Sequence, residues 1–222
     1  FDQGQATIKV ISWEDFFNHD GSEPVREFQT MSSVERWGFA LSETASMVGA
    51  GDPLRIRQTE GSRDFFSLFG ARPAMGRLFV DDDYRAANVA ILDHGTWERV
   101  FGLDSEVVGR SIRVDDALYE VVGVLSESFV PPEGIYYGDT GSDVWLPLDL
   151  TKEEFDRIGY HSLEVVGRVV PGATLADVEA EMDRVGERLT QQYPEHFLDD
   201  EGNSRYSTPP ALLQEITTRP VR

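Results

Sequence analysis

The four histidines are the first side chains to consider for acid–base or metal chemistry. They are His19, His94, His161 and His196. They fall in different expected elements, and no HExxH or His-x-His spacing brings two of them onto one metal ion. His94 beside Asp93 is the best candidate for a general base. Because the junction between a strand and a helix commonly uses such residues for capping, we predict no catalytic role for His94.

Two acidic runs could bind calcium through their carboxylate oxygens. They are Asp81–Asp83 and the run DDEGN at residues 199–203. A calcium loop of the EF-hand type needs ligands at alternate positions and a glycine at its sharp turn, and neither run has that alternation. We interpret Asp81–Asp83 as a solvated turn and predict no metal site at either run.

The sequence lacks the motifs of nucleophilic and cofactor-dependent enzymes. It has no Gly-x-Ser-x-Gly elbow, no Walker loop and no dinucleotide fingerprint, and without cysteine it has no thiol nucleophile. Tyr136 and Tyr137, in the Gly- and Pro-rich segment 126–142, could offer a stacking platform, but such a pair more often packs on its own domain. We therefore predict no catalytic, cofactor-binding or metal-binding residue, and a protein that is not an enzyme.

The charge balance excludes nucleic acid as a partner. Forty acidic residues against 20 basic ones give a formal net charge of −20, and Lys9 and Lys152 are the two lysines among mostly arginine. We interpret the acidic excess as adaptation to a saline medium, where screening weakens self-repulsion. The alternative is a surface for divalent cations or a cationic ligand, for which no cluster has the required spacing.

Hydrophobic residues make up 40% of the 222 positions, enough for a real core in one domain or two small lobes. No stretch approaches the roughly 18 to 20 uninterrupted apolar residues that a membrane-spanning helix needs, and Phe1 begins without a signal-peptide pattern. We expect these residues to form a soluble domain.

The elements that would position these side chains follow from periodicity and from capping and turn residues. In the centre we expect a helix over 62–70, turns at Pro73 and Gly76, a strand over 89–92, helices over 96–101 and 105–108, and a hairpin of 111–114 with 118–124. Outside it we expect a helix over 12–17, strands over 6–11, 34–44, 54–58 and 163–170, and a helix over 174–193. That last helix carries one apolar stripe: Leu175, Val178, Met182, Val185 and Leu189.

Eight short pieces of sequence carry a resemblance through their order and separation. They are FF at 65–66, GARPAMGR at 70–77, VAIL at 89–92, WERVFG at 97–102, VVGR at 107–110, YEVVGV at 119–124, DVWLPL at 143–148, and HSLEVVGR at 161–168 with PG at 171–172. Together they closely resemble the MacB-like periplasmic core domain of ABC transporter permeases, in the FtsX-like permease family. The resemblance covers nearly the whole chain and is weakest before about Leu54 and after Pro194.

The resemblance implies an α+β fold of two lobes. Residues 1–72 and 159–222 would form a membrane-proximal, porter-like lobe of βαβ units, and residues 73–158 a smaller inserted α+β lobe. We expect the inserted lobe to have its own core, with strands 89–92 and 118–124 outside the sheet that holds 163–170.

The resemblance also implies a function. The domain would follow the first transmembrane helix of a permease in the cell membrane, lie on the periplasmic side, and couple cytoplasmic ATP hydrolysis to export or envelope processes by mechanical transmission. Its partners would be the transmembrane helices of the same permease, a second copy in a homodimer, an ATPase subunit or domain, and an envelope protein. The alternative is a free-standing envelope module that binds a ligand or acts as a scaffold; an enzyme comes third.

Overall fold

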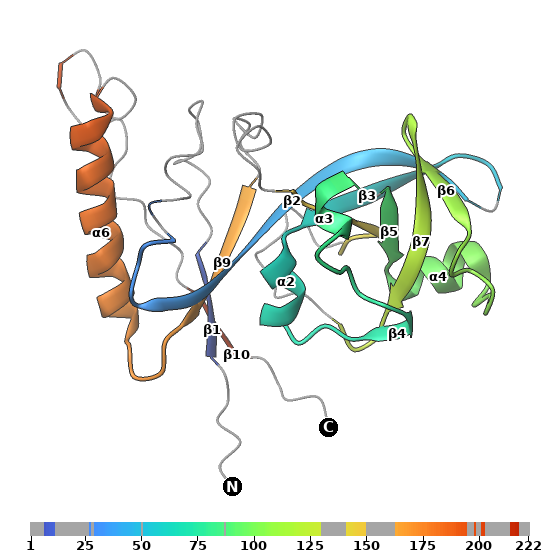
Figure 1. The fold of residues 1–222 in the computed structure, drawn as a ribbon, viewed down its shortest axis with the longest axis horizontal. Coiled ribbons are helices and arrows are strands. Elements are labelled where there is room, and N and C mark those ends of the chain that lie inside the picture. The colour runs from blue at the N-terminus through green and yellow to red at the C-terminus, as the bar shows by residue number, and fades with distance from the viewer. Residues whose placement is uncertain are drawn as a thin grey trace, which may run out of the picture. The chain divides into compact units, whose positions relative to one another are not determined.

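The fold is α+β, as expected, and the chain splits into two compact units. The structure is a computed structural model that describes residues 7–11, 27, 29–49, 51–86, 88–129, 141–149, 163–194, 198, 201–202 and 214–217. The first unit comprises residues 1–37 and 150–220, and the second comprises residues 38–149. Figure 1 labels the elements of both except β8. The helix expected over 12–17 lies outside the described residues.

The first unit holds a split βαβ motif. Its strands are β1 (Thr7–Ile11), β9 (Leu163–Val169), β10 (Gln214–Thr217) and the start of β2 (Val34–Val48), in the order β10-β1-β9-β2. β1 pairs antiparallel with both β9 and β10. β9 and β10 therefore run parallel, and helix α6 (Leu175–Gln192) connects them in the chain, as a crossover between parallel strands requires.

Helix α6 forms where its capping box and its apolar stripe predicted it. Thr174 Oγ1 accepts the backbone N–H of Asp177 over 3.2 Å, and Asp177 Oδ2 accepts the backbone N–H of Thr174 over 2.7 Å. The buried side chains of the helix are Val178, Met182, Val185 and Leu189. One face thus packs against the rest of the first unit while acids and arginines cover the other. The stripe predicted from the sequence is confirmed at these four positions, and its fifth member, Leu175, is half-buried at the start of the helix.

In its described residues, the second unit is a mixed sheet with three short helices. Its strands are the rest of β2, β3 (Leu54–Gly61), β4 (Pro73–Gly76), β5 (Val89–Leu92), β6 (Ser111–Val114), β7 (Ala117–Leu125) and β8 (Val144–Pro147), and its helices are α2 (Arg63–Leu68), α3 (Asp83–Ala86) and α4 (His94–Phe101). The strand order is β2-β3-β8-β5-β7-β4, with β6 paired to β2 and β7. β3 and β8 run parallel, as do β5 and β7.

The core of the second unit lies on the face of this sheet covered by α4. Its buried members come from six strands, from α4 and from the turn after α4: Ala45, Met47, Ile56, Ala90, Leu92, Phe101, Val107, Ile112, Val114, Val121, Val124, Val144 and Leu146. A separate aromatic cluster joins Phe65 and Phe66 of α2 to Trp145 of β8, with ring centroids 5.5 and 5.2 Å apart. The strand predicted over 89–92 and the hairpin predicted over 111–124 are confirmed.

Strand β2 is longer than predicted and contributes residues to both units. It continues to Val48 because Met47 pairs with Leu54 of β3 and with Val114 of β6, which extends the ladder beyond Thr44. The order of paired strands therefore passes through β2 from β9 to β5 and β7. Our expectation that strands 89–92 and 118–124 would lie outside the sheet of β9 is wrong for this reason.

Two local predictions in the second unit are also wrong. Residues 73–76 form strand β4 on β7 instead of only turning, and residues 105–108 form turns instead of a helix. α4 ends at Gly102, whose φ is 60°, and the indole of Trp97 donates to the carbonyl of Asp104 over 2.9 Å. The Asp104 carboxylate accepts the backbone N–H of Glu106 over 2.9 Å, but the backbone N–H of Gly109 donates to the carbonyl of Val121 on β7 over 2.8 Å, so the chain joins β7 instead of continuing as a helix.

Gly76 of β4 and Gly123 of β7 lie opposite each other where these two strands pair antiparallel. A Cβ atom on Gly76 would collide with the carbonyl oxygen of Val122, and one on Gly123 would collide with that of Arg77. Gly76 also has a φ of +67°, which glycine adopts without penalty. Both glycines belong to the pieces that carry the family resemblance, and both are required by this close approach of backbones.

Candidate functional site

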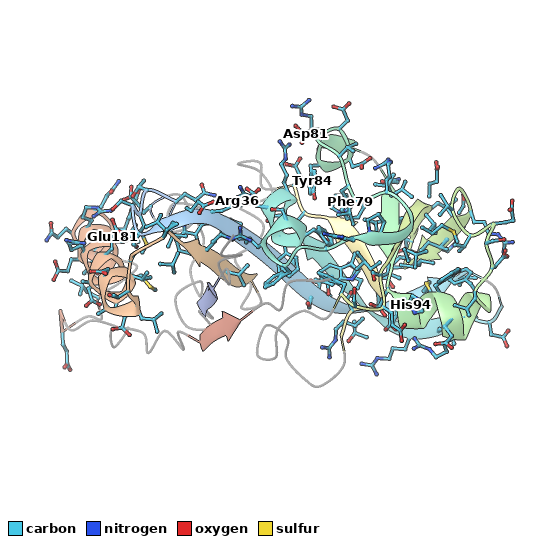
Figure 2. The ribbon with its side chains drawn as sticks, turned by 90° about the horizontal axis from the view of Figure 1, so that it is seen from below. Arg36, Phe79, Asp81, Tyr84, His94 and Glu181 are labelled. Carbon is cyan, nitrogen blue, oxygen red and sulfur yellow. The ribbon has the colours of Figure 1, made fainter. Side chains whose placement is uncertain are left out.

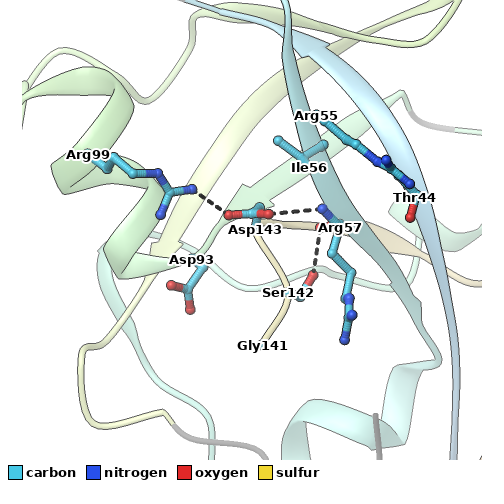
Figure 3. Close-up of a pocket in the computed structure, with 9 residues that line it drawn as sticks. All are labelled: Thr44, Arg55, Ile56, Arg57, Asp93, Arg99, Gly141, Ser142 and Asp143. Atoms are coloured by element: carbon cyan, nitrogen blue, oxygen red, sulfur yellow. Dashed lines mark hydrogen bonds and ion pairs between the residues drawn. The ribbon is translucent and has the colours of Figure 1, made fainter. Parts of the chain in front are cut away.

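An open pocket of about 470 Å³ lies within the second unit (Figure 3). β2, β3, α4 and the segment before β8 surround it. Its lining residues are Thr44, Arg55, Ile56, Arg57, Asp93, Arg99, Gly141, Ser142 and Asp143. Five of these nine residues are charged, so the pocket is polar. The opposite face of β3, by contrast, is part of the core.

Asp143 joins three elements at one end of this pocket. Its carboxylate accepts hydrogen bonds from the backbone N–H of Arg57 on β3 (2.9 Å), from Thr96 Oγ1 on α4 (3.0 Å) and from Arg99 Nη2 on α4 (2.6 Å). Its backbone N–H donates to the carbonyl of Arg57 over 2.9 Å. The side chain of Asp143 is 24% exposed. Its hydrogen bonds hold α4 and the start of β8 against β3.

Asp93 and Ser142 complete this junction. Asp93 Oδ2 accepts the backbone N–H of Gly95 over 2.9 Å and so caps α4, while the Asp93 backbone N–H donates to the carbonyl of Asp143 over 3.1 Å. Burial raises the pKa of Asp93, and the nearby charge of Asp143 adds to the increase. Ser142 Oγ donates to the carbonyl of Val144 over 2.9 Å. These groups serve the fold of the junction.

The three arginines of the pocket differ in their partners. Arg99 is paired with Asp143. Arg57 presents a buried Nη1 atom that donates to no acceptor among the described residues. Figure 3 shows its side chain running from β3 past Ser142 and away from Asp143. Arg55 is exposed, and its position two residues before Arg57 puts it on the same face of β3.

His94 is the first residue of α4 (Figure 2). Its ring lies edge-to-face with that of Trp97, with centroids 5.5 Å apart, directly after the capping residue Asp93. These contacts suit the junction of a strand and a helix, as the sequence indicated. The absence of a catalytic role for His94 stays a prediction.

The aspartates of Asp81–Asp83 pair with three different arginines. The pairs are Asp81 with Arg63 (2.9 Å), Asp82 with Arg85 (3.5 Å) and Asp83 with Arg77 (2.5 Å). Asp83 is 5% exposed and also accepts the backbone N–H of Val80 over 2.8 Å, so the run is partly buried and not simply a solvated turn. In the ranges that the structure describes, no group of three histidine, aspartate or glutamate side chains could hold a metal ion.

Other candidates from the sequence lie outside the described residues: His19, His161, His196, Tyr136, Tyr137, and residues 199, 200 and 203 of the second acidic run. The sequence analysis did not single out Asp143, Arg57 or Arg99. The one available signal was the alternation of Arg55, Ile56 and Arg57 in a half-buried strand, which places both arginines on the face opposite Ile56.

The family model for the MacB-like periplasmic core domain matches residues 3–185. The chain belongs to this family. MacB-like periplasmic core domains are extracytoplasmic parts of ABC transporter permeases. In this chain the fold has the strand order and the glycine pair described above.

Two curated relatives show the extent of the similarity. A probable export ATP-binding/permease protein MacB from Pseudomonas entomophila is 23% identical over 195 residues, which cover 82% of this chain and 28% of that protein. A macrolide export ATP-binding/permease protein MacB from Chromobacterium violaceum is 28% identical over 172 residues, covering 70% and 26%. This domain therefore spans about a quarter of the length of these relatives.

Two solved structures share the fold. The periplasmic region of MacB from Actinobacillus actinomycetemcomitans superposes with a TM-score of 0.61 at 14% identity, covering 86% of each chain. The extracellular domain of the noncanonic ABC-type transporter YknZ from Gram-positive bacteria gives a TM-score of 0.61 at 14% identity, covering 85% of this chain and 95% of that one. Among the described residues of this domain, no helix combines the length and the apolar character needed to cross a membrane.

Proposed function

We propose that this domain works on the extracytoplasmic side of a permease in the cell membrane and transmits motion driven by cytoplasmic ATP hydrolysis to an export or envelope process. Membership of the MacB-like family and the names of the curated relatives support this proposal. The observation that carries it is the rigid attachment of α6 to the segment that leads into β2. An element that transmits motion must resist deformation itself.

Three kinds of contact make this attachment. The apolar stripe of α6 is buried, with Met182 6% exposed. Glu181 on the same helix accepts hydrogen bonds from the backbone N–H groups of Ser32 (2.9 Å) and Ser33 (2.8 Å). Arg188, two turns further on, pairs with Glu27 over 3.1 Å. Apolar packing and polar contacts therefore hold α6 in place over more than two of its turns.

The lobe boundaries belong to the same proposal. The sequence suggested a porter-like lobe of residues 1–72 and 159–222 and an inserted lobe of residues 73–158. The two compact units divide at residues 37/38 and 149/150, which supports a second lobe that also includes residues 38–72. We propose that β2, which has residues in both units, is the element through which a displacement of the first unit reaches the second.

The partners of the domain follow from its place in a permease. We propose transmembrane helices of the same chain on both sides of this domain, a second copy in a homodimer, an ATPase subunit or domain that supplies the energy, and an envelope protein that receives the motion. The domain itself would have no catalytic role. The words ATP-binding and permease in the names of the curated relatives support the first and third of these partners.

The coding sequence on either side of this domain provides the first test. An apolar helix ending shortly before Phe1, and three more after Arg222, are the expected result. A signal peptide directly before Phe1 and a stop codon after Arg222 would instead support the alternative of a free-standing envelope module, because such a protein could not receive motion from transmembrane helices.

A further inference from the structure

The pocket of the second unit gathers cationic side chains on a strongly acidic protein. Three arginines line it in a chain of net charge −20. The carboxylate of Asp143 is already occupied by Arg99 and by the backbone N–H of Arg57, and that of Asp93 caps α4. The pocket's own carboxylates thus serve the junction, and no ion pair within the described residues includes Arg55 or Arg57.

Arg57 is the unusual residue of this group. Its backbone is fixed on both sides by Asp143, through the N–H to Oδ2 (2.9 Å) and through the carbonyl to the Asp143 N–H (2.9 Å). Its Nη1 atom is buried and has no acceptor in the described part of the chain. A buried donor without an acceptor costs free energy, and folded proteins rarely retain one without a reason. Arg57 also lines the open pocket, so an anion that enters the pocket lies beside this guanidinium.

We propose that this pocket binds a small oxyanion, a carboxylate or a phosphate, through the guanidinium of Arg57. Arginine suits both groups because its planar N–H donors match two oxygens at once. Arg55 lies on the same face of β3 about 6.6 Å along the strand, so a ligand with two anionic groups could contact both arginines. Thr44 is the β2 partner of Arg57, and its hydroxyl is a further donor on the pocket wall.

The test measures binding to the 222-residue protein by calorimetry and by its melting temperature. Sodium phosphate and sodium malonate, a dicarboxylate, are titrated separately against sodium chloride at equal ionic strength. We expect a saturable rise in melting temperature with at least one of them. A rise with phosphate alone identifies a phosphate site, and a rise with malonate alone identifies a carboxylate site. Equal effects of all three salts would overturn the proposal.

Variants connect the binding to these residues. Arg57→Gln should weaken binding by at least about tenfold, since a hydrogen bond to a charged group is lost. Arg55→Gln, at an exposed position where folding is not in question, should weaken a two-site ligand by a smaller factor. Arg113→Gln is the matched control, because Arg113 is exposed on β6 and does not line the pocket. Unchanged affinity in both pocket variants would overturn the proposal.

A second readout needs no ligand. Arg57→Met keeps most of the length of the side chain but removes the buried donor. It should leave the melting temperature in chloride buffer unchanged or raise it, while it abolishes the rise with oxyanion. A lower melting temperature in chloride would mean that Arg57 stabilises the empty protein, and the pocket would then be structural. Because these measurements involve no transport, they can fail while the proposed mechanical function holds.

Discussion

Glu181 Oε1 accepts two hydrogen bonds from Ser32, one from its backbone N–H over 2.9 Å and one from its hydroxyl over 2.8 Å. The two residues are 149 positions apart in the chain. Through this contact the half-buried Glu181 of α6 holds the residues that lead into β2. The stripe of α6 and this carboxylate are neighbours on the helix, so apolar packing and polar attachment act on the same turn.

This contact predicts a pH dependence of stability. Burial acts to raise the pKa of Glu181, but hydrogen bonds from Ser33 and Ser32 outweigh it and lower the pKa to about 2. A depressed folded-state pKa stabilises the protein above the ordinary value of 4.5 and loses that contribution as pH falls toward about 2. Glu181→Gln should therefore lower the free energy of unfolding at neutral pH by about 1 kcal/mol, discounted because the carboxylate is partly exposed.

The difference between wild type and Glu181→Gln should shrink between pH 5 and pH 2, measured by chemical denaturation. Glu179→Gln is the matched control, since Glu179 is exposed on the same helix. A constant difference across this pH range would show that the ionised carboxylate is not what holds Ser32 and Ser33.

The junction around Asp143 gives the second prediction. Asp143→Ala removes the acceptor for the Arg57 N–H, Thr96 and Arg99, and should lower the free energy of unfolding by about 2 to 4 kcal/mol. Asp143→Asn keeps one carbonyl oxygen and should cost less. Asp116→Ala, in the exposed turn between β6 and β7, should stay within about 0.5 kcal/mol. Equal losses in Asp143→Ala and Asp116→Ala would contradict this account.

The close approach of the paired strands β4 and β7 gives the third prediction. Gly123→Ala would place a methyl group against the carbonyl of Arg77, and we expect a loss of about 2 to 3 kcal/mol in equilibrium unfolding. Gly186→Ala is the contrasting change, because Gly186 lies within α6 with open space around it. It should raise stability by about 0.5 to 1 kcal/mol through helix propensity. If both changes stabilise the protein, the backbones do not approach as described.

The acidic composition gives the fourth prediction. If the excess of carboxylates reflects a saline medium, raising sodium or potassium chloride from about 0.1 to 1 M should raise the melting temperature without saturation, since screening relieves repulsion in the folded state. Millimolar calcium should add nothing beyond its ionic strength. A large, saturable rise with calcium alone would contradict the prediction of no metal site and direct attention to Asp81 or to residues 199–203.

The sequence was informative wherever one local pattern decides the structure. The capping box and stripe of α6, and the hairpin of β6 and β7 around Asp115, each lie within about 20 residues, and each was predicted. Asp115 even adopts the left-handed φ of 48° that its turn requires. Local periodicity and turn residues are enough for such elements because their partners are close in the chain.

Contacts between distant residues could not be predicted in this way. The extension of β2 depends on pairing with β6, 65 or more residues later, and nothing near Met47 or Val48 indicates it. Asp143 reads as one carboxylate among 40 until β3 and α4 are placed beside it. Polar groups that serve tertiary contacts have no periodicity of their own, so the pocket and the Glu181 contact were both missed.

The last prediction concerns mechanism and uses the full-length permease in its own membrane. Met182→Asp places a carboxylate at a position 6% exposed, with no cationic group among the residues described as buried with it, and should cost about 3 to 5 kcal/mol. Loss of this packing frees α6 from the rest of the first unit. Export or resistance should therefore fall while the protein is still inserted in the membrane. Ala180→Asp, at an exposed position of the same helix, should cost less than about 1 kcal/mol and keep activity.

His94→Ala is the counterpart in the second unit. It removes a ring contact with Trp97, which costs less than about 1 kcal/mol, and should leave transport nearly intact because His94 has no chemistry in this account. The measurement is transport or resistance at matched expression, scored beside nucleotide hydrolysis, which mechanical uncoupling should spare. Wild-type activity in Met182→Asp, together with lost activity in a normally folded His94→Ala protein, would mean that the domain acts through a chemical site and not by transmitting motion.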